Sequence, residues 1–340
     1  MVSKILVGSL GITAILAGSM WYLALTKNRI PTAVPYTYSG PVEKISIANV
    51  GEYSIFNIIA KNKGYFTKYG LDATVTEYSS GVTSMAGLTS GKVDVAIAGD
   101  FVGVHNMFTY PDLRIITEAS KQSVWQLIGR KDKGINTTAD LKGKKVGLTK
   151  SGSGQYYLGG FLTLNKINYS DLIIVDLSPV ELEAHLASGQ IDAAVVFEPY
   201  GYNLLKKLGN QATIFQVQGD AKAVILAFTT KGFIDTHSSV LERYVRALVD
   251  ADKYVKSNPE NAKRILATTM HYDDAYVQHV WPKFVFGTKL DQELILTMED
   301  QASWMMENSM MEKAATPNYI DFIDFKPLET AKPGASSIIR

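Results

Sequence analysis

The chain has 340 residues, of which 46% are hydrophobic and 20% are charged, and its formal net charge is +1. A chain of this size and composition buries a sizeable core, and its balanced charge gives no field that would favour nucleic acid as a partner. Because it has no cysteine, disulfides, thiolate metal sites and thiol nucleophiles are excluded.

An uncharged and mostly apolar run covers residues 5–25 and is flanked by Lys4, Lys27 and Arg29. A helix of this length spans about 30 Å, the thickness of a membrane's hydrocarbon core. A buried helix of a soluble protein is one interpretation of this run. The two leading interpretations are that residues 1–27 are a membrane anchor, or that they are a signal peptide with a cleavage site at residues 17–19. Both place the rest of the chain outside the cytoplasm, in the periplasm or at the cell surface. The proline-containing residues 28–41 then form a tether.

The body of the chain begins with alternating strands and helices. We expect strands at residues 44–49, 71–78 and 93–98, separated by a helix over 56–62 and by a helix that Ser80 or Thr83 would cap. After a constant offset the same order returns, with strands at 145–149, 172–177 and 191–197 and helices at 156–165 and 179–188. A repeat of this length indicates two similar α/β lobes rather than a solenoid.

One corner occurs in both units, as LTSGKVDVAIAGD at residues 88–100 and as LASGQIDAAVVFE at residues 186–198. Helical connections make the strands mostly parallel, and ligands bind outside the carboxyl ends of parallel strands. Asp100 and Glu198 end equivalent strands. If the lobes face each other, both acids look into one cleft.

Two further strands, at residues 124–130 and 224–230, are expected to cross between the lobes and to act as a hinge. The following residues are helical: a helix over 240–255 with Ser238 or Ser239 as its cap, then helices from residues 259 and 291. They should pack on the first lobe. The predicted domains are therefore a first lobe of residues 42–124 and 225–325, a second lobe of residues 125–224, and a tail of residues 326–340.

Five segments in this order resemble a known family: GYFTKYGLDATV, LTSGKVDVAIAG, INTTADLKGKKVGLTKSGSG, LASGQIDAAVVFEPY and YVKSNPENAKRIL. They are similar to the solute-binding proteins of ABC importers for nitrate, aliphatic sulfonates, taurine and related ions, over residues 42–325. The resemblance implies a two-lobed clamshell of the type II periplasmic-binding-protein class that closes on a small molecule and docks on a permease and ATPase. It implies no cofactor, and we expect a monomer. Ser19 stands where lipidated relatives carry cysteine, so lipid attachment there is excluded.

Position in the fold selects the candidate ligand-binding residues. They are Glu52, Tyr53, Ser54, Ser80, Gly81, Val82, Asp100, Phe101, Ser123, Trp125, Ser151, Gly152, Ser153, Gly154, Gln155, Tyr156, Phe197, Glu198 and Tyr200. The small residues at 151–154 open a helix, whose free N–H groups and dipole favour an anion. Glu198 and Asp100 could hold an ammonium, and the aromatic rings could enclose a stem or a quaternary amine. A taurine-like acid that carries an amine fits this description.

An enzyme is not expected, since the chain lacks a nucleophile elbow, a phosphate loop and a Gly-x-Gly-x-x-Gly motif. Its histidines are scattered, which argues against a metal site. Two alternatives to import remain. One is a sensor input module for a membrane signalling partner, and the other is a binding protein or enzyme related to thiamin-pyrimidine synthesis.

Overall fold

The computed structural model of the protein describes residues 38–311 and 316–340. The predicted anchor or signal segment, residues 1–27, and most of the predicted tether lie outside these residues. No helix in the described part is both long and apolar enough to cross a membrane. Residues 39–340 form one unit of mutual contacts.

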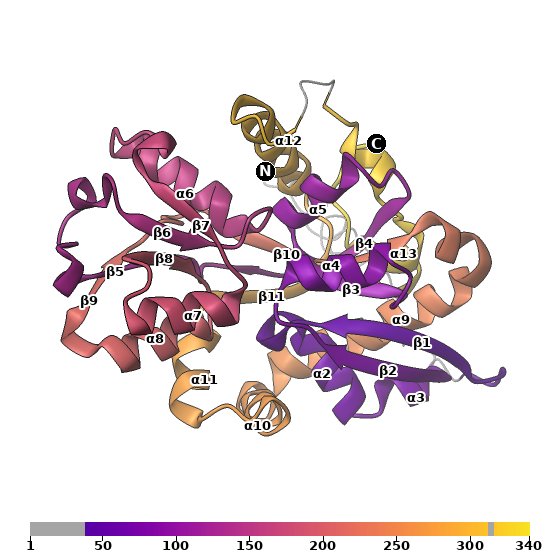
Figure 1. The fold of residues 1–340 in the computed structure, drawn as a ribbon. Helices are drawn as coiled ribbons and strands as arrows, with labels where there is room; N and C mark the ends of the chain where they lie inside the picture. Colours follow the sequence, from indigo (N-terminus) through magenta and orange to yellow (C-terminus); the bar gives the residue numbers. More distant parts are fainter. Residues whose placement is uncertain (1–37, 312–315) are drawn as a thin grey trace, which may run out of the picture. The chain divides into compact units, whose positions relative to one another are not determined.

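The first sheet has six strands in the order β11-β4-β10-β3-β1-β2 (Figure 1). Their bounds are β1 (Glu43–Asn49), β2 (Leu71–Glu77), β3 (Val95–Gly99), β4 (Leu113–Gln122), β10 (Ala223–Thr230) and β11 (Phe284–Lys289). β1 is parallel to β2 and β3, whereas β10 is antiparallel to β3 and β4, and β11 is antiparallel to β4. We call the part of the molecule built on this sheet the first lobe.

The second sheet has five strands in the order β7-β6-β8-β5-β9. Their bounds are β5 (Gln126–Arg130), β6 (Lys145–Leu148), β7 (Ile173–Asp176), β8 (Ala193–Val196) and β9 (Ala212–Phe215). β6 is parallel to β7 and β8, and β5 is antiparallel to β8 and β9. This order and these orientations match β2-β1-β3-β10-β4, so the predicted α/β fold with a duplicated sheet is confirmed. We call this part the second lobe.

The helices connect the strands and cover the sheets. The α-helices are α2 (Ile55–Asn62), α3 (Tyr65–Lys68), α4 (Gly81–Thr89), α5 (Asp100–Met107), α6 (Ser153–Leu164), α7 (Pro179–Ser188), α8 (Tyr200–Leu208), α9 (Lys231–Ser257), α10 (Pro259–Met270), α11 (Asp274–Val280), α12 (Gln292–Glu307) and α13 (Lys326–Ala331). Short 3-10 turns are η1 (Gly51–Ser54), η2 (Lys131–Lys133), η3 (Thr138–Leu141), η4 (Tyr169–Asp171), η5 (Gly209–Gln211), η6 (Trp281–Lys283) and η7 (Tyr319–Phe322).

Helix caps account for several boundaries and correct one of them. Ser80 and Thr83 both cap α4, as a reciprocal pair. The cap predicted at Ser238 or Ser239 is displaced: Thr230 caps α9, which begins at Lys231, and the helix is interrupted at His237, one residue before Ser238. Non-helical dihedral angles at His237 kink that helix, which explains why its apolar periodicity starts only after the kink.

The repeated corner is explained by local structure. Gly91 and Gly189 both take positive φ, 72° and 76°, which glycine adopts without strain. Asp94 Oδ2 accepts hydrogen bonds from Ser46 N and Oγ, at 2.7 and 2.6 Å, and Asp192 Oδ2 accepts one from Lys145 N at 2.9 Å. Each aspartate therefore fastens the start of β3 or β8 to the neighbouring strand, a structural role that both lobes require.

The predicted crossing strands are shifted in the structure. Residues 124–130 fall mostly in β5 and residues 224–230 in β10, so each of these segments belongs to one sheet. The links between the lobes are the short segments 123–125 and 216–222. Gln218 fastens the two links, since its Oε1 accepts from Trp125 N at 3.0 Å and its Nε2 donates to Gln122 O at 2.7 Å.

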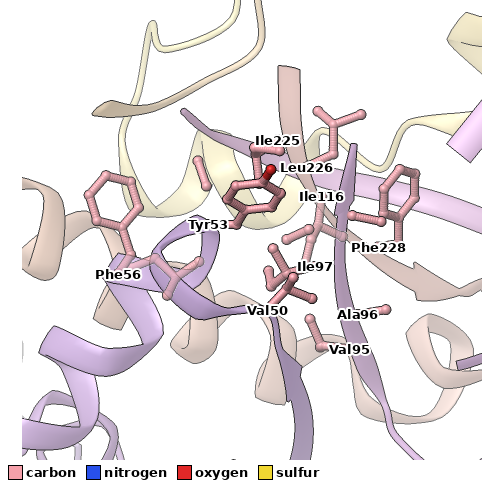
Figure 2. Packing of buried hydrophobic residues seen from close by; sticks show 14 of the residues in the cluster. Val50, Tyr53, Phe56, Val95, Ala96, Ile97, Ile116, Ile225, Leu226 and Phe228 are labelled. Atoms are coloured by element: carbon pink, nitrogen blue, oxygen red, sulfur yellow. The ribbon is translucent and has the colours of Figure 1, made fainter. Parts of the chain in front are cut away.

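The first-lobe core reaches the cleft through Tyr53. Figure 2 shows its ring among apolar side chains, with Val50 nearby and Ile225 beside its hydroxyl end. Ile97 and Phe228, from the neighbouring strands β3 and β10, lie fully buried in the same cluster. The side chain of Tyr53 is therefore fixed by close packing where it joins the core.

Candidate functional site

Two cavities lie between the lobes and share the side chains of Tyr53 and Phe197. The larger, of about 230 Å³, is called the acidic chamber; its wall includes Glu52, Tyr53, Glu77, Tyr78, Tyr272, Phe197, Glu198 and Tyr200. The smaller, of about 30 Å³, is called the inner chamber; its wall includes Tyr53, Ser80, Gly81, Val82, Gln122, Trp125, Gly152, Ser153 and Phe197. Both lobes contribute to both walls.

Helices from opposite lobes begin at the inner chamber. Gly81 and Val82 open α4, and Gly152 and Ser153 open α6. No side chain caps α6, in contrast to α4, so no side chain competes for the first N–H groups of α6. Since helix dipoles are positive at these ends, the inner chamber favours an anion.

Three buried polar atoms at the inner chamber have no hydrogen-bond partner: the Tyr53 hydroxyl, Gln122 Oε1 and Trp125 Nε1. The Gln122 amide lies near enough to Tyr53 to lower the pKa of its hydroxyl, but the two do not reach hydrogen-bonding geometry. Burial and the nearby Glu52 outweigh this effect and raise the pKa of Tyr53, so its hydroxyl stays protonated and can donate. Unpaired buried polar groups are costly, which makes these atoms candidates for contact with a bound molecule.

Glu52 is a deeply buried acid of the acidic chamber, with 2% of its surface exposed. Its Oε1 accepts a hydrogen bond from the Tyr276 hydroxyl at 2.6 Å, and its Oε2 accepts one from the Tyr272 hydroxyl at 3.1 Å. Burial raises the pKa of Glu52 to about 7 and outweighs these two hydrogen bonds. Glu77 lies at the edge of the chamber, where its carboxylate accepts a hydrogen bond from Gly51 N and partial burial of the carboxyl raises its pKa.

Glu198 joins the two lobes. Its side chain is fully buried, and its Oε1 lies 2.9 Å from His279 Nε2 and forms an ion pair with Lys283 Nζ. Its Oε2 accepts a hydrogen bond from Tyr202 N at 2.9 Å. His279 lies on α11 and Lys283 in η6, immediately before β11 of the first sheet, whereas Glu198 follows β8 of the second sheet. We call this contact, of Glu198 with His279 and Lys283, the interlobe ion pair.

The structure brings most of the sequence-predicted residues to the two chambers. Those that line one or both are Glu52, Tyr53, Ser80, Gly81, Val82, Trp125, Gly152, Ser153, Phe197, Glu198 and Tyr200. Those that line neither are Ser54, Asp100, Phe101, Ser123, Ser151, Gly154, Gln155 and Tyr156.

The repeat predicts that Asp100 meets Glu198 in the cleft, but the structure places Asp100 elsewhere. It starts α5, and its buried carboxylate accepts hydrogen bonds from Phe101 N at 2.8 Å and Val224 N at 3.2 Å. Burial raises its pKa to about 6. Asp100 therefore fastens α5 to β10 inside the first lobe.

The other predicted residues outside the chambers have structural contacts of their own. Ser54 Oγ accepts from Val50 N, and Ser123 Oγ belongs to the link, where it donates to Ala221 O at 3.4 Å. Phe101 packs on Tyr156, and the Tyr156 hydroxyl donates to Asp300. Gln155 Oε1 accepts from Ser151 N at 3.0 Å, and Ser151 Oγ lies 3.1 Å from His105 Nε2.

Residues missed from the sequence include Gln122 and Tyr272, which line a chamber, and His279 and Lys283, which contact Glu198 from outside the wall of the acidic chamber. Gln122 had one signal, since it is a polar residue at the end of the buried strand β4. The other three lie in the C-terminal part of the chain, more than seventy positions beyond the second lobe's last predicted site residue. No spacing within the sequence connects them to the cleft.

Comparison with known proteins places the chain among binding proteins. The family model described as "NMT1/THI5 like" matches residues 52–262. A putative aliphatic sulfonates-binding protein of Bacillus subtilis is 24% identical over 66% of this chain and 69% of its own. The taurine-binding periplasmic protein of Escherichia coli is 24% identical, over 72% of each chain.

A solved structure shares the fold. The alkanesulfonate-binding protein SsuA from Xanthomonas axonopodis pv. citri, bound to MOPS, superposes with a TM-score of 0.72. It is 18% identical, and the match covers 84% of this chain and all of that one. The family resemblance predicted from the sequence and the two-lobed fold are thus confirmed.

Proposed function

The chain belongs to the NMT1/THI5-like family, and from this premise we propose that it is the solute-binding component of an ABC importer. It captures a small organic acid by closure of its lobes outside the cytoplasm and delivers it to a membrane permease. The named relatives are binding proteins, which supports capture rather than catalysis. One of them is periplasmic, which supports the location.

One observation carries this proposal: unsatisfied donors from both lobes meet at the inner chamber. The uncapped start of α6 and Trp125 Nε1 lie on one side, and Tyr53 with its hydroxyl lies on the other. Their common complement is an anionic head group with several acceptor oxygens, such as a sulfonate. The chamber, of about 30 Å³, is too small for a whole solute, so we assign only the head group to it.

Closure explains why such a molecule would be held. A ligand that touches both lobes only in the closed form shifts the equilibrium toward that form. The links at residues 123–125 and 216–222 absorb the rotation, and Gln218 connects them. Gln122 Oε1 is an acceptor, and a sulfonate has no hydrogen to donate to it. A bound water or an N–H or O–H group would therefore be needed to pair it.

Isothermal titration of the purified full-length protein with butanesulfonate, taurine, glycine betaine and nitrate tests the proposal. We expect binding of at least one sulfonate with a Kd in the micromolar range or below. Trp125→Phe removes one donor and keeps an aromatic ring, so it should weaken that sulfonate about tenfold. Absence of binding to every sulfonate would refute the ligand class. Equal binding by the variant would remove Trp125 from the site.

A further inference from the structure

The acidic chamber differs in charge from the inner chamber. Glu52, Glu77 and Glu198 line it, and the described residues of its wall include no lysine or arginine. Lys283 and His279 approach Glu198 from outside that wall. The remaining two carboxyl groups line the cavity and form no ion pair among the described residues, so their ionised forms would make it favourable for a cation.

Among the acids of the acidic chamber, Glu52 is the one whose contacts least suggest a purely structural role. More than nine-tenths of it is buried, and both carboxylate oxygens are held by neutral tyrosine hydroxyls rather than by a cation. Among the described residues it forms no ion pair, whereas Glu198, equally buried, is paired with Lys283. The two tyrosine hydroxyls offset only part of the cost of burying this carboxylate, so a proton or a cation from elsewhere would stabilise it further.

Aromatic rings form much of the rest of the wall. Tyr53 and Phe197 have ring centroids 5.8 Å apart, and Phe197 and Tyr200 have centroids 5.3 Å apart. Tyr78 and Tyr272 complete the set. Aromatic faces around a negative cavity attract ammonium and quaternary ammonium groups.

The two chambers meet at one pair of side chains. Tyr53 and Phe197 line both of them, and the unpaired Tyr53 hydroxyl is held in that shared wall. A molecule with its acid group in the inner chamber and a short apolar stem alongside Tyr53 and Phe197 would extend into the acidic chamber.

We propose that the acidic chamber binds the cationic nitrogen of the solute, an ammonium or quaternary ammonium group, with Glu52 as its counter-ion. Glu77 adds negative charge at the mouth, and the tyrosine and phenylalanine rings enclose the cation. This inference rests on the proposed function, because it assigns the second half of the same solute. The substrate class is therefore a zwitterion whose acid and amine are separated by a short stem.

Calorimetric titration with two matched sulfonates tests it. In 3-aminopropanesulfonate an ammonium stands where butanesulfonate has a methyl group, so the two differ in charge and hardly in size. The wild-type protein should bind the aminosulfonate at least tenfold more tightly. Glu52→Gln keeps an acceptor for one tyrosine and removes the charge, so it should reduce that preference to threefold or less without weakening butanesulfonate.

Controls separate this effect from general electrostatics and from misfolding. Glu299→Gln makes the same charge change on the exposed side of α12 and should leave both affinities unchanged. If Glu52→Gln does not fold, as judged by circular dichroism, Glu77→Gln at the chamber edge should still lower the preference two- to threefold. Equal wild-type affinity for the two sulfonates, or an equal loss of both in Glu52→Gln, would overturn the proposal.

Tetramethylammonium distinguishes this inference from the proposed function, because it has a cationic nitrogen and no acid. If neither sulfonate binds, the sulfonate function fails. Binding of tetramethylammonium that Glu52→Gln abolishes would then still support the chamber, and absence of that binding would overturn it.

Discussion

Glu198 of the second lobe and His279 of the first lie 2.9 Å apart, between Oε1 and Nε2, and Lys283 binds the same carboxylate oxygen. The two lobes are thus joined through a side chain that water does not reach. Other bonds across the cleft are more exposed, such as Lys206 to Asp273 at 3.5 Å. Since buried pairs are screened less than exposed ones, we expect the interlobe ion pair to hold the lobes together more strongly than these exposed pairs do.

Loss of Lys283 should open the protein rather than unfold it. Lys283→Met leaves a buried carboxylate with His279 alone, and opening exposes that carboxylate to water. We expect the closed form to lose about 2 kcal/mol, below the 3–5 kcal/mol typical of fully buried pairs because Lys283 is partly exposed. Small-angle X-ray scattering should show a larger radius of gyration. Lys206→Met, which breaks an exposed interlobe pair, serves as the control and should leave the radius unchanged.

Substitution of Gly154 tests whether ligand affinity depends on the position of the Trp125 ring. A Cβ at Gly154 would lie 2.5 Å from Trp125 Cζ3 and 3.0 Å from Val195 Cγ1, so the indole would have to move. Gly154→Ala should weaken butanesulfonate at least tenfold in calorimetry, since Trp125 lines the small inner chamber. On the same helix, Gly160→Ala meets no atom within 4 Å. It should stabilise the helix by about 1 kcal/mol and leave affinity unchanged. Equal affinity of the two variants would contradict the assignment.

The unpaired hydroxyl of Tyr53 predicts opposite effects on stability and binding. Tyr53→Phe removes a buried group that lacks a partner, so the free energy of unfolding of the unliganded protein should rise by about 1 kcal/mol. Affinity for butanesulfonate should fall several-fold, because a donor to the head group is lost. Urea unfolding and calorimetry measure the two quantities.

Tyr319 provides the matched control for this pair of effects. Its hydroxyl is also buried and unpaired, but Tyr319 lies in η7 and lines neither chamber. Tyr319→Phe should raise stability by a similar amount and leave butanesulfonate affinity as it is. A fall in affinity in both variants would mean that Tyr53 acts through stability and not through contact.

The duplicated sheets were predictable because the same turns and strand contacts occur in both lobes and require the same residues. The Ser-Gly corners need a left-handed glycine, and Asp94 and Asp192 fasten equivalent strands, so the sequence repeats where the backbone does. Strands without a counterpart or a clear alternation, such as β4 and β11, were not predicted. Their pairing depends on residues distant in the chain.

The site was predictable only in part, for the same reason. Glu52, Ser153 and Glu198 were predicted from their place in loops at the carboxyl ends of strands, since topology decides where those loops lie. Asp100 and Glu198 occupy equivalent places in the repeat but have different contacts, because the Asp100 carboxylate accepts hydrogen bonds from backbone N–H groups of α5 and β10. His279 reaches the cleft by tertiary packing of α11, which leaves no signal in residue spacing.

The raised pKa of Glu52 predicts that stability falls as the pH rises. The native protein binds a proton up to about pH 7, whereas the unfolded chain releases it near 4.5, so the folded state holds more protons between these values. Unfolding free energy should therefore decrease by up to about 3 kcal/mol from pH 4.5 to above pH 7. Burial raises the pKa of Asp100 and Glu118 as well, to about 6 and about 7, with the same sign.

Glu52→Gln isolates the share of Glu52 in that pH dependence. Tyr272 and Tyr276 lower its pKa and Glu198 raises it, and all three remain in the variant. Urea unfolding of the unliganded protein at pH 5.5 and pH 8 should show a smaller loss of stability in the variant than in the wild type. A bound ammonium would favour the charged carboxylate, so 3-aminopropanesulfonate should bind more tightly at pH 8 than at pH 5.5, and butanesulfonate should show no such gain. An equal pH response of both sulfonates would place the titrating group outside the acidic chamber.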